Sequence, residues 1–294
     1  YTAQFTPNLG AQFDRFFHFA AADAVPDAAK SKAISFVIAA GVIAAFAGPN
    51  LAKFTQHLGT VPYAYSYFSI ILLSILAFGV VSLLKLQKPI NLPTNDTAKK
   101  GRPLKEIIKN KDTILALLSS ATAFVVMGMA MTTTPIAMHG FGHPSDSPAT
   151  VIQWHVLGMF LPSFFTGMLI QKFGVYRIIF TGILLLFVYI IIAVTGTGFT
   201  NFVTALFIVG LGWNFLFIGG SSLLTKVYRP EEKEKTQAFN DFTVFTAMAI
   251  SSFFAGSLYN NFGWNGVNLV LLPLLIVTLI MAIRMMKADI KTDY

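Results

Sequence analysis

Eight stretches of this 294-residue chain contain no Asp, Glu, Lys or Arg, and each is about long enough to cross a lipid bilayer as a helix. A helix rises ~1.5 Å per residue, so about 20 apolar residues cross the hydrocarbon core. The stretches are continuous rather than alternating, which favours helices over β-strands. They are residues 34–52, 63–84, 113–138, 151–170, 178–194, 202–224, 242–258 and 267–283. The sequence therefore predicts an all-α, polytopic membrane helical bundle.

The composition supports a membrane protein rather than a soluble one. Charged residues make up 12% of the chain, about half the share that is usual in soluble domains. There is no cysteine, which excludes disulfides and thiolate metal sites. A net charge of +8 would suggest nucleic acid as the partner of a soluble protein. Here the positions of the charges along the chain indicate a different partner.

The basic residues lie on alternate connections between the predicted spans. Nineteen of the 21 Lys and Arg residues fall in 30–32, 85–111, 172–177, 226–235 and 284–291. Cytoplasmic loops of membrane proteins carry such an excess of positive charge. We therefore expect these loops and the C-terminus to be cytoplasmic. The expected partner is the lipid bilayer, and no nucleic acid is expected.

The longest connection, residues 85–112, is the one candidate domain boundary. It contains three prolines, a polar run and a basic segment, a composition typical of a flexible linker. We favour a solvated tether over a lipid-binding segment. The predicted domains are 1–84, the linker 85–112, and a six-helix half at 113–294. A weak echo between 26–33 and 230–236 suggests that the chain has two related halves.

A short basic turn, GMLIQKFGVYR at residues 167–177, joins spans 151–170 and 178–194. Lys172 and Arg177 must stay in water, which places the turn outside the bilayer. Gly167 and Gly174 allow close helix packing and a tight chain reversal.

The pattern G-x-L-x-x-K-x-G-x-x-R in this turn resembles the cytoplasmic-loop signature of the major facilitator superfamily of transporters. That family usually has an acidic residue where this chain has Gln171. Residues 15–22 are similar to the family's fourth-helix arginine motif, and 41–49 to the antiporter motif of its fifth helix. The resemblance runs from the fourth helix to the twelfth. It implies two pseudo-symmetric halves, the N-terminal one incomplete and lacking about three helices.

The resemblance implies a secondary active transporter, an efflux-type permease or antiporter of the bacterial inner membrane. Such a protein moves a small molecule by alternating access, is coupled to protons, and is expected to be a monomer without a cofactor. Two alternatives stay open. A membrane-embedded enzyme would need clustered His, Asp or Glu, and none of the spans holds a carboxylate. A non-transporting fragment is the other.

Polar residues in the middle of a span are candidates for a central substrate cavity. Trp213 and Asn214 lie halfway along 202–224. Trp213 offers a flat ring with one N–H, and Asn214 offers a donor and an acceptor. Cavity lining and hydrogen bonding between helices are equally compatible with Asn214.

Thr132, Thr133 and Thr134 precede a proline near one end of span 113–138. For at least two of them we expect a hydrogen bond to their own helix backbone, and for one a cavity-facing hydroxyl. Met131 is a flexible cavity-lining candidate, although core packing is the favoured interpretation. His155 is a candidate proton carrier. His139 and His143 have metal-like spacing, but nearby glycines and a proline disfavour a helix, so no metal site is predicted.

The remaining candidates follow from the resemblance and concern gating and charge. The cytoplasmic gate is expected to comprise Gly167, Gln171, Lys172, Gly174, Arg177, Asn240 and Asp241. Lys172 or Arg177 would contact the start of span 34–52. Asp14 and Arg15 are the charges that a complete fourth helix would carry into the membrane. They are proton or substrate groups if that helix forms, and solvated if its end is frayed.

Overall fold

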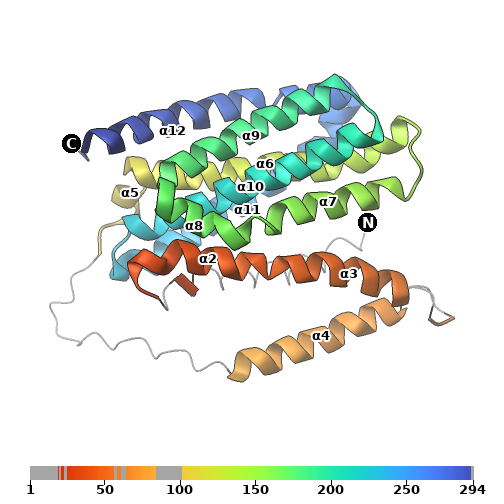
Figure 1. Cartoon of the computed structure of the whole chain (residues 1–294), viewed down its shortest axis with the longest axis horizontal. Helices are drawn as coiled ribbons and strands as arrows, with labels where there is room; N and C mark the ends of the chain where they lie inside the picture. The colour runs from red at the N-terminus through yellow and green to blue at the C-terminus, as the bar shows by residue number, and fades with distance from the viewer. Residues whose placement is uncertain are drawn as a thin grey trace. The chain divides into compact units, whose positions relative to one another are not determined.

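The computed structural model describes residues 19, 21–22, 25–55, 58–60, 64–83 and 101–292, and no β-strand occurs among them. They form two compact units. One comprises residues 1–42 and 102–294, and the other comprises 43–101. Both are helical (Figure 1), as the uncharged stretches predicted.

Most of the long helices of the larger unit overlap predicted spans. They are η2 (Asp27–Ala29), α2 (Lys30–Ala39), α5 (Leu104–Ile107), α6 (Lys111–Gly140), α7 (Ser147–Phe160), α8 (Ser163–Phe173), α9 (Val175–Thr195), α10 (Phe199–Val227), η3 (Pro230–Glu232), α11 (Lys233–Leu269) and α12 (Leu272–Thr292). Five segments between Lys111 and Asp289 are long and apolar enough to cross a membrane. The last of them, Pro230–Asp289, contains two of the predicted spans. The chain is thus a polytopic helical membrane protein.

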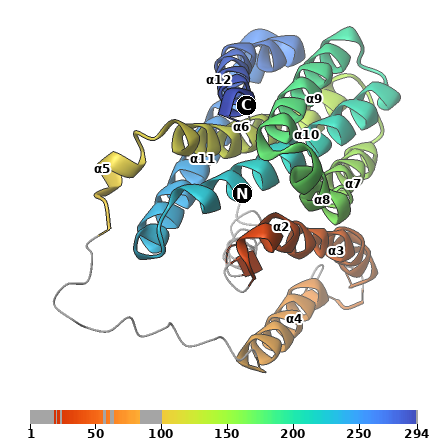
Figure 2. The same cartoon turned by 60° about the vertical axis from the view of Figure 1, so that its left-hand side comes forward.

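Helix α10 is the centre of the larger unit. It packs against α6, α7 and α9, and these helices run side by side in both views (Figures 1 and 2). Every residue from Gly212 to Thr225 is buried. A helix that is buried all round must be surrounded by other helices rather than by lipid or water. The polar residues between Gly212 and Thr225 therefore face protein on every side.

Three breaks shape the helices around α10. The chain turns at Leu161 and Pro162, which separate α7 from α8 within the predicted span 151–170. Gly174 reverses the chain between α8 and α9 with φ +87°, and Gly263 kinks α11 with φ +65°. L-residues with side chains rarely adopt positive φ, so glycine is required at both positions. The reversal at Gly174 is the tight turn that the sequence predicted.

The predicted span 34–52 is also divided, because α2 ends at Ala39 and α3 (Gly41–Thr55) begins two residues later. A Cβ at Gly41 would lie 2.5 Å from the ring of Phe160. Only glycine leaves room for that ring at the break.

The smaller unit contains most of α3 and the apolar helix α4 (Ala64–Leu83). The hydroxyls of Thr55 and Ser66 are 2.8 Å apart and join the two helices. The unit boundaries differ from those predicted. Residues 102–112, expected in the linker, belong to the larger unit, which also includes residues 1–42.

Candidate functional site

Trp213 lies in an aromatic cluster at the heart of the larger unit. The cluster comprises Phe124 on α6, Phe160 on α7, and Trp213 and Phe217 on α10. The Trp213 ring centroid is 5.3 Å from that of Phe124, 6.2 Å from Phe160 and 4.9 Å from Phe217. Its side chain is 4% exposed, and its Nε1 has no hydrogen-bond partner among the described residues. A buried N–H without a partner is costly, so the unpaired indole N–H of Trp213 is an unusual feature of this cluster.

Asn214, the next residue, makes three hydrogen bonds around the break between α7 and α8. Its Nδ2 donates to the Met159 carbonyl at 2.6 Å and to the Ser163 hydroxyl at 2.5 Å. Its Oδ1 accepts from the Thr166 hydroxyl at 2.6 Å. Met159 lies in the last turn of α7, where carbonyls lack partners within their own helix. In this structure Asn214 therefore makes the inter-helix contact, and none of its surface is exposed.

The threonines of α6 differ from one another. The Thr133 hydroxyl donates to the Met129 carbonyl at 2.8 Å, the backbone bond expected for threonines before a proline. The Thr134 hydroxyl is buried and has no partner among the described residues. Met131 and Thr132 are half-buried. Of the three threonines, all described, only Thr133 makes the backbone bond that we expected for at least two, and Thr134 is the one with a buried hydroxyl that lacks a partner.

His155 on α7 is completely buried against α10. Its Nδ1 lies 2.8 Å from the Leu206 carbonyl, and its Nε2 has no partner among the described residues. A carbonyl can only accept, so Nδ1 carries the hydrogen, and in the neutral ring Nε2 is a free acceptor. Small residues set the distance between the two helices here. A Cβ at Gly158 would lie 2.5 Å from the Phe207 carbonyl oxygen.

The loop signature contacts the segment that contains η2 and α2. A Cβ at Gly167 would lie 2.6 Å from the Lys32 Cα, so only glycine fits beside α2. The Gly167 N–H donates to the Ser35 hydroxyl at 2.7 Å, and Gln171 donates to the Ala28 carbonyl at 2.6 Å. The expected contact with the start of span 34–52 is present, but its atoms come from Gly167 and Gln171.

The two basic residues of the turn do not take part in that contact. Lys172 and Arg177 are exposed, and Lys172 lies over the ring of its neighbour Phe173. Long basic side chains keep their charged ends in water, whereas a glycine allows the backbones themselves to touch. In place of the expected Lys172 or Arg177 contact, the structure has a neutral one.

Asn240 and Asp241 lie on α11, one helical turn after Gln237. Asn240 is buried, and its Nδ2 donates to the Asp241 carboxylate at 3.1 Å. The Asn240 Oδ1 has no partner among the described residues. Asp14 and Arg15 lie outside the described residues. His143, one of the two histidines with metal-like spacing, contacts the Thr197 carbonyl. Over the described part of the chain, no three His, Cys, Asp or Glu residues are placed to hold a metal ion.

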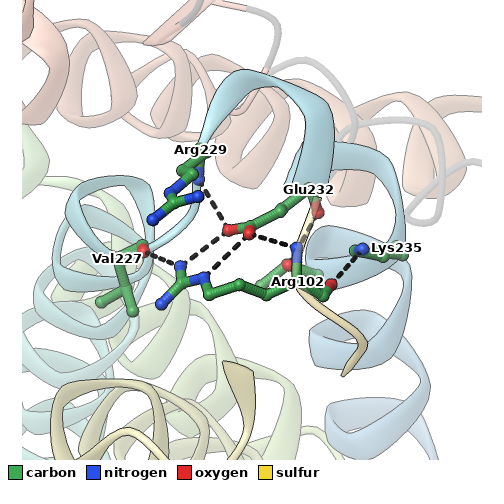
Figure 3. Close-up of polar contacts among 6 residues, drawn as sticks. Arg102, Val227, Arg229, Glu232 and Lys235 are labelled. Atoms are coloured by element: carbon green, nitrogen blue, oxygen red, sulfur yellow. Dashed lines mark hydrogen bonds and ion pairs between the residues drawn. The ribbon is translucent and has the colours of Figure 1, made fainter. Parts of the chain in front are cut away.

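Sequence reasoning missed an ion pair between Arg102 and Glu232, which we call the Arg102–Glu232 clamp. The Arg102 backbone N–H and Nε each donate to Glu232 Oε1 at 2.8 Å, and Nη2 donates to Oε2 at 2.7 Å. Arg102 also donates to the Val227 carbonyl at 3.0 Å, and Lys235 donates to the Arg102 carbonyl. Figure 3 shows the guanidinium and the carboxylate facing each other.

The clamp joins the segment before α5 to the turn between α10 and α11. Glu232 is completely buried, and the Arg229 N–H donates to it at 3.0 Å. The hydrogen bond from Arg102 lowers the pKa of Glu232 to about 2 against the effect of burial, with backbone donors adding to it. The only signal in the sequence was the opposite charge of two segments 130 residues apart. No spacing rule pairs residues over such a distance.

Comparison with known proteins places the chain in a family. The Major Facilitator Superfamily profile matches residues 146–293. The riboflavin transporter RfnT of Brucella anthropi is 39% identical over 285 residues, which are 96% of this chain and 71% of RfnT. This chain belongs to the major facilitator superfamily.

Two further relatives of this superfamily chain are uncharacterized MFS-type transporters of Bacillus subtilis. YddS is 27% identical and YdeG is 30% identical, each over 82% of this chain. The chain spans 58% of the length of each. The chain is therefore that of a membrane transporter, as the loop signature predicted.

The matched range 146–293 covers α7 to α12 almost completely. It contains the loop signature, His155, Trp213 and Asn214, and the pair Asn240 and Asp241. Thr132 to Thr134 and Met131 precede it on α6. The similarity to RfnT extends over nearly the whole chain. The superfamily assignment thus rests on the same helices that hold most of the candidate residues.

Proposed function

We propose that this chain forms part of a secondary transporter that carries a flat, aromatic small molecule of the riboflavin kind across the bacterial inner membrane. The observation that carries the proposal is the 39% identity to a protein named as a riboflavin transporter, over 96% of this chain. Transport proceeds by alternating access of one central site to the two sides of the membrane, and it is coupled to protons.

The aromatic cluster supports a flat substrate. Aromatic faces and edges bind other flat rings by stacking and edge contacts. The indole N–H of Trp213 has no partner among the described residues, and a ring carbonyl of a flavin is an acceptor suited to it. Trp213 is 4% exposed, which fits a state in which the site is closed. Asn214 holds the α7–α8 break beside the cluster, and Thr134 and Met131 on α6 are further candidates for the cavity wall.

The test is riboflavin transport by the complete transporter in proteoliposomes, with flux measured in both directions to separate uptake from efflux and antiport. Trp213→Phe keeps a ring but removes the N–H. We expect it to weaken riboflavin binding about tenfold, the cost of one hydrogen bond lost in a buried site. Trp154→Phe is the matched control, because Trp154 is 47% exposed. Equal riboflavin affinity in all three proteins would contradict a role for Trp213, and no riboflavin transport by the wild type would contradict the substrate.

His155 supports the proton coupling, because its buried Nε2 is a free acceptor. His155→Gln should abolish the acceleration of transport by an imposed pH gradient while leaving equilibrium substrate binding in place. The exposed His139 offers the control His139→Gln. If His155→Gln responds to the pH gradient as the wild type does, His155 is not the proton carrier.

The cytoplasmic gate is proposed to include the contact of Gly167 and Gln171 with the Ala28–Ser35 segment, together with Asn240 and Asp241. Lys172, Gly174 and Arg177 complete the same turn. This assignment requires a cytoplasmic C-terminus. The family resemblance also implies that the protein is a monomer. The absence of cysteine makes the sidedness testable. Lys287→Cys should react with an impermeant thiol reagent only from the cytoplasmic side, and reaction from outside would reverse the orientation.

A further inference from the structure

A groove of about 520 Å³ lies along one face of α12 at the beginning of α6. Its apolar wall consists of Val277, Ile280, Met281, Met285 and Ala288. These residues recur at intervals of three or four, so they form a single stripe along the helix. Val277 and Ile280 are 57% and 46% exposed. In a membrane protein, such a stripe is exposed to acyl chains rather than to water.

Two cations line the same groove, Lys111 from α6 and Arg284 from α12. Both are exposed, and the described residues give neither of them an ion pair. The carboxylate next to Lys111, Asp112, accepts a hydrogen bond from the Tyr176 hydroxyl at 2.8 Å and forms no ion pair with Lys111. Asp289, farther along α12, also has an interaction of its own. The groove thus combines an apolar wall with two positive charges that no groove residue neutralises.

We propose that this groove binds one anionic phospholipid, with an acyl chain along the α12 stripe and its phosphate at Lys111 and Arg284. Basic pockets between membrane helices on the cytoplasmic side hold anionic headgroups by charge complementarity. Arg284 can form two parallel bonds with a phosphate, and Lys111 adds a point charge. A zwitterionic headgroup would bring its own ammonium group beside these cations. The groove therefore selects phosphatidylglycerol over phosphatidylethanolamine.

The choice of a phospholipid over a soluble phosphate rests on the apolar wall. A free phosphate would use only the two cations, whereas the stripe gives an acyl chain about three turns of helix from Val277 to Ala288. The proposal does not depend on the transported substrate, because the groove residues are separate from the aromatic cluster and from His155.

The test is native mass spectrometry of the complete, delipidated transporter with phosphatidylglycerol and phosphatidylethanolamine of matched chain length. The wild type should retain phosphatidylglycerol preferentially. Lys111→Gln and Arg284→Gln should each reduce that preference about fivefold, and the double variant about 25-fold. Lys105→Gln with Lys226→Gln removes two exposed cations outside the groove and is the matched control. It should bind lipid as the wild type does.

Each outcome decides the proposal. Equal retention of the two lipids by the wild type would overturn it, and so would an equal loss in the control, which would show a general effect of surface charge. Glycerol phosphate, which lacks acyl chains, should not displace the lipid, and displacement would indicate a soluble phosphate site instead. Thermal melting of the double variant in detergent should match that of the wild type, because neither side chain has an ion pair among the described residues. If the melting curves of the double variant and the wild type differ, Arg284→Lys is compared with the wild type instead. This variant keeps the charge and should keep the preference for phosphatidylglycerol.

Discussion

Two polar centres hold the larger unit together, and they use opposite chemistry. The Arg102–Glu232 clamp pairs full charges in the turn where α11 begins. The centre at Asn214 uses only neutral groups in the middle of α10. Both Glu232 and Asn214 are completely buried. The difference teaches that burial alone does not decide which groups a protein uses.

Their surroundings explain the difference. The side chain of Arg102 is 23% exposed, so the clamp keeps one side in contact with water. Asn214 lies in a 14-residue buried run of a membrane helix. A charge at the centre of a membrane helix costs roughly 3 kcal/mol or more, whereas a neutral amide can satisfy a free carbonyl at much lower cost. The charged pair therefore lies at a helix end, and the neutral amide in the middle of α10.

We expect the largest loss of unfolding free energy from removing one partner of the Arg102–Glu232 clamp. Arg102→Ala leaves a buried carboxylate without its cation, which typically costs about 3–5 kcal/mol. Reversible unfolding in detergent would measure the loss. Arg229→Ala is the matched control, because Arg229 donates to the Glu232 carboxylate through its backbone N–H, which alanine retains. A loss of unfolding free energy below about 1 kcal/mol for Arg102→Ala would show that water replaces Arg102 as the partner of Glu232 at little cost.

Acid should weaken the clamp in a second way. The pKa of Glu232 is lowered from 4.5 to about 2 in the folded protein, chiefly by the hydrogen bond from Arg102. Its contribution is then complete above pH 4.5 and is lost as the pH falls towards 2, because the unfolded state binds the proton more tightly. Melting temperatures at pH 7, 5 and 3 should fall more for the wild type than for Glu232→Gln. Parallel curves would exclude Glu232 as the titrating group. Asn214 does not titrate and adds nothing to this pH dependence.

Removing the neutral centre should cost less than removing Arg102. Asn214→Leu leaves the Met159 carbonyl and the hydroxyls of Ser163 and Thr166 without this partner. We expect a loss of about 1–2 kcal/mol, the range for hydrogen bonds between membrane helices. Unfolding in the same detergent would give the value. Asn214→Gln retains the amide on a longer side chain and serves as the comparison. A loss larger than that of Arg102→Ala would reverse the order of the two centres.

The smallest effect is expected at the exposed contact between Gln171 and Ala28. Gln171→Ala should change the unfolding free energy by less than about 0.5 kcal/mol, because an exposed donor finds water instead. Gly167→Ala at the same contact should be much more harmful, since its Cβ would lie 2.6 Å from the Lys32 Cα. Comparing the two variants in one melting series separates exposure from close packing. Equal effects would mean that the side chain of Gln171, and not the glycine, holds α2 in place.

The candidate site was predictable in part, and the limits are physical. Trp213 and Asn214 stood out because polar groups in the middle of a span are rare. The sequence left two roles open for Asn214, because a membrane-centre amide can face a cavity or another helix. The position of the break at Pro162 is what brings the Met159 carbonyl within reach. Gly167, rather than Lys172, packs against α2 because a close helix contact favours the residue with the least bulk, and Gln171 donates to the Ala28 carbonyl in η2.

The sequence by itself determined the class of the protein and the approximate positions of its apolar helices. Those properties depend on the free energy of moving each segment into lipid, which is nearly a sum over consecutive residues. Only the tertiary structure decided that Arg102 pairs with Glu232, that α10 is the central helix, and that Lys111 meets the α12 stripe. Each of these depends on which helix faces are in contact, and local sequence does not encode contacts between residues more than a hundred positions apart.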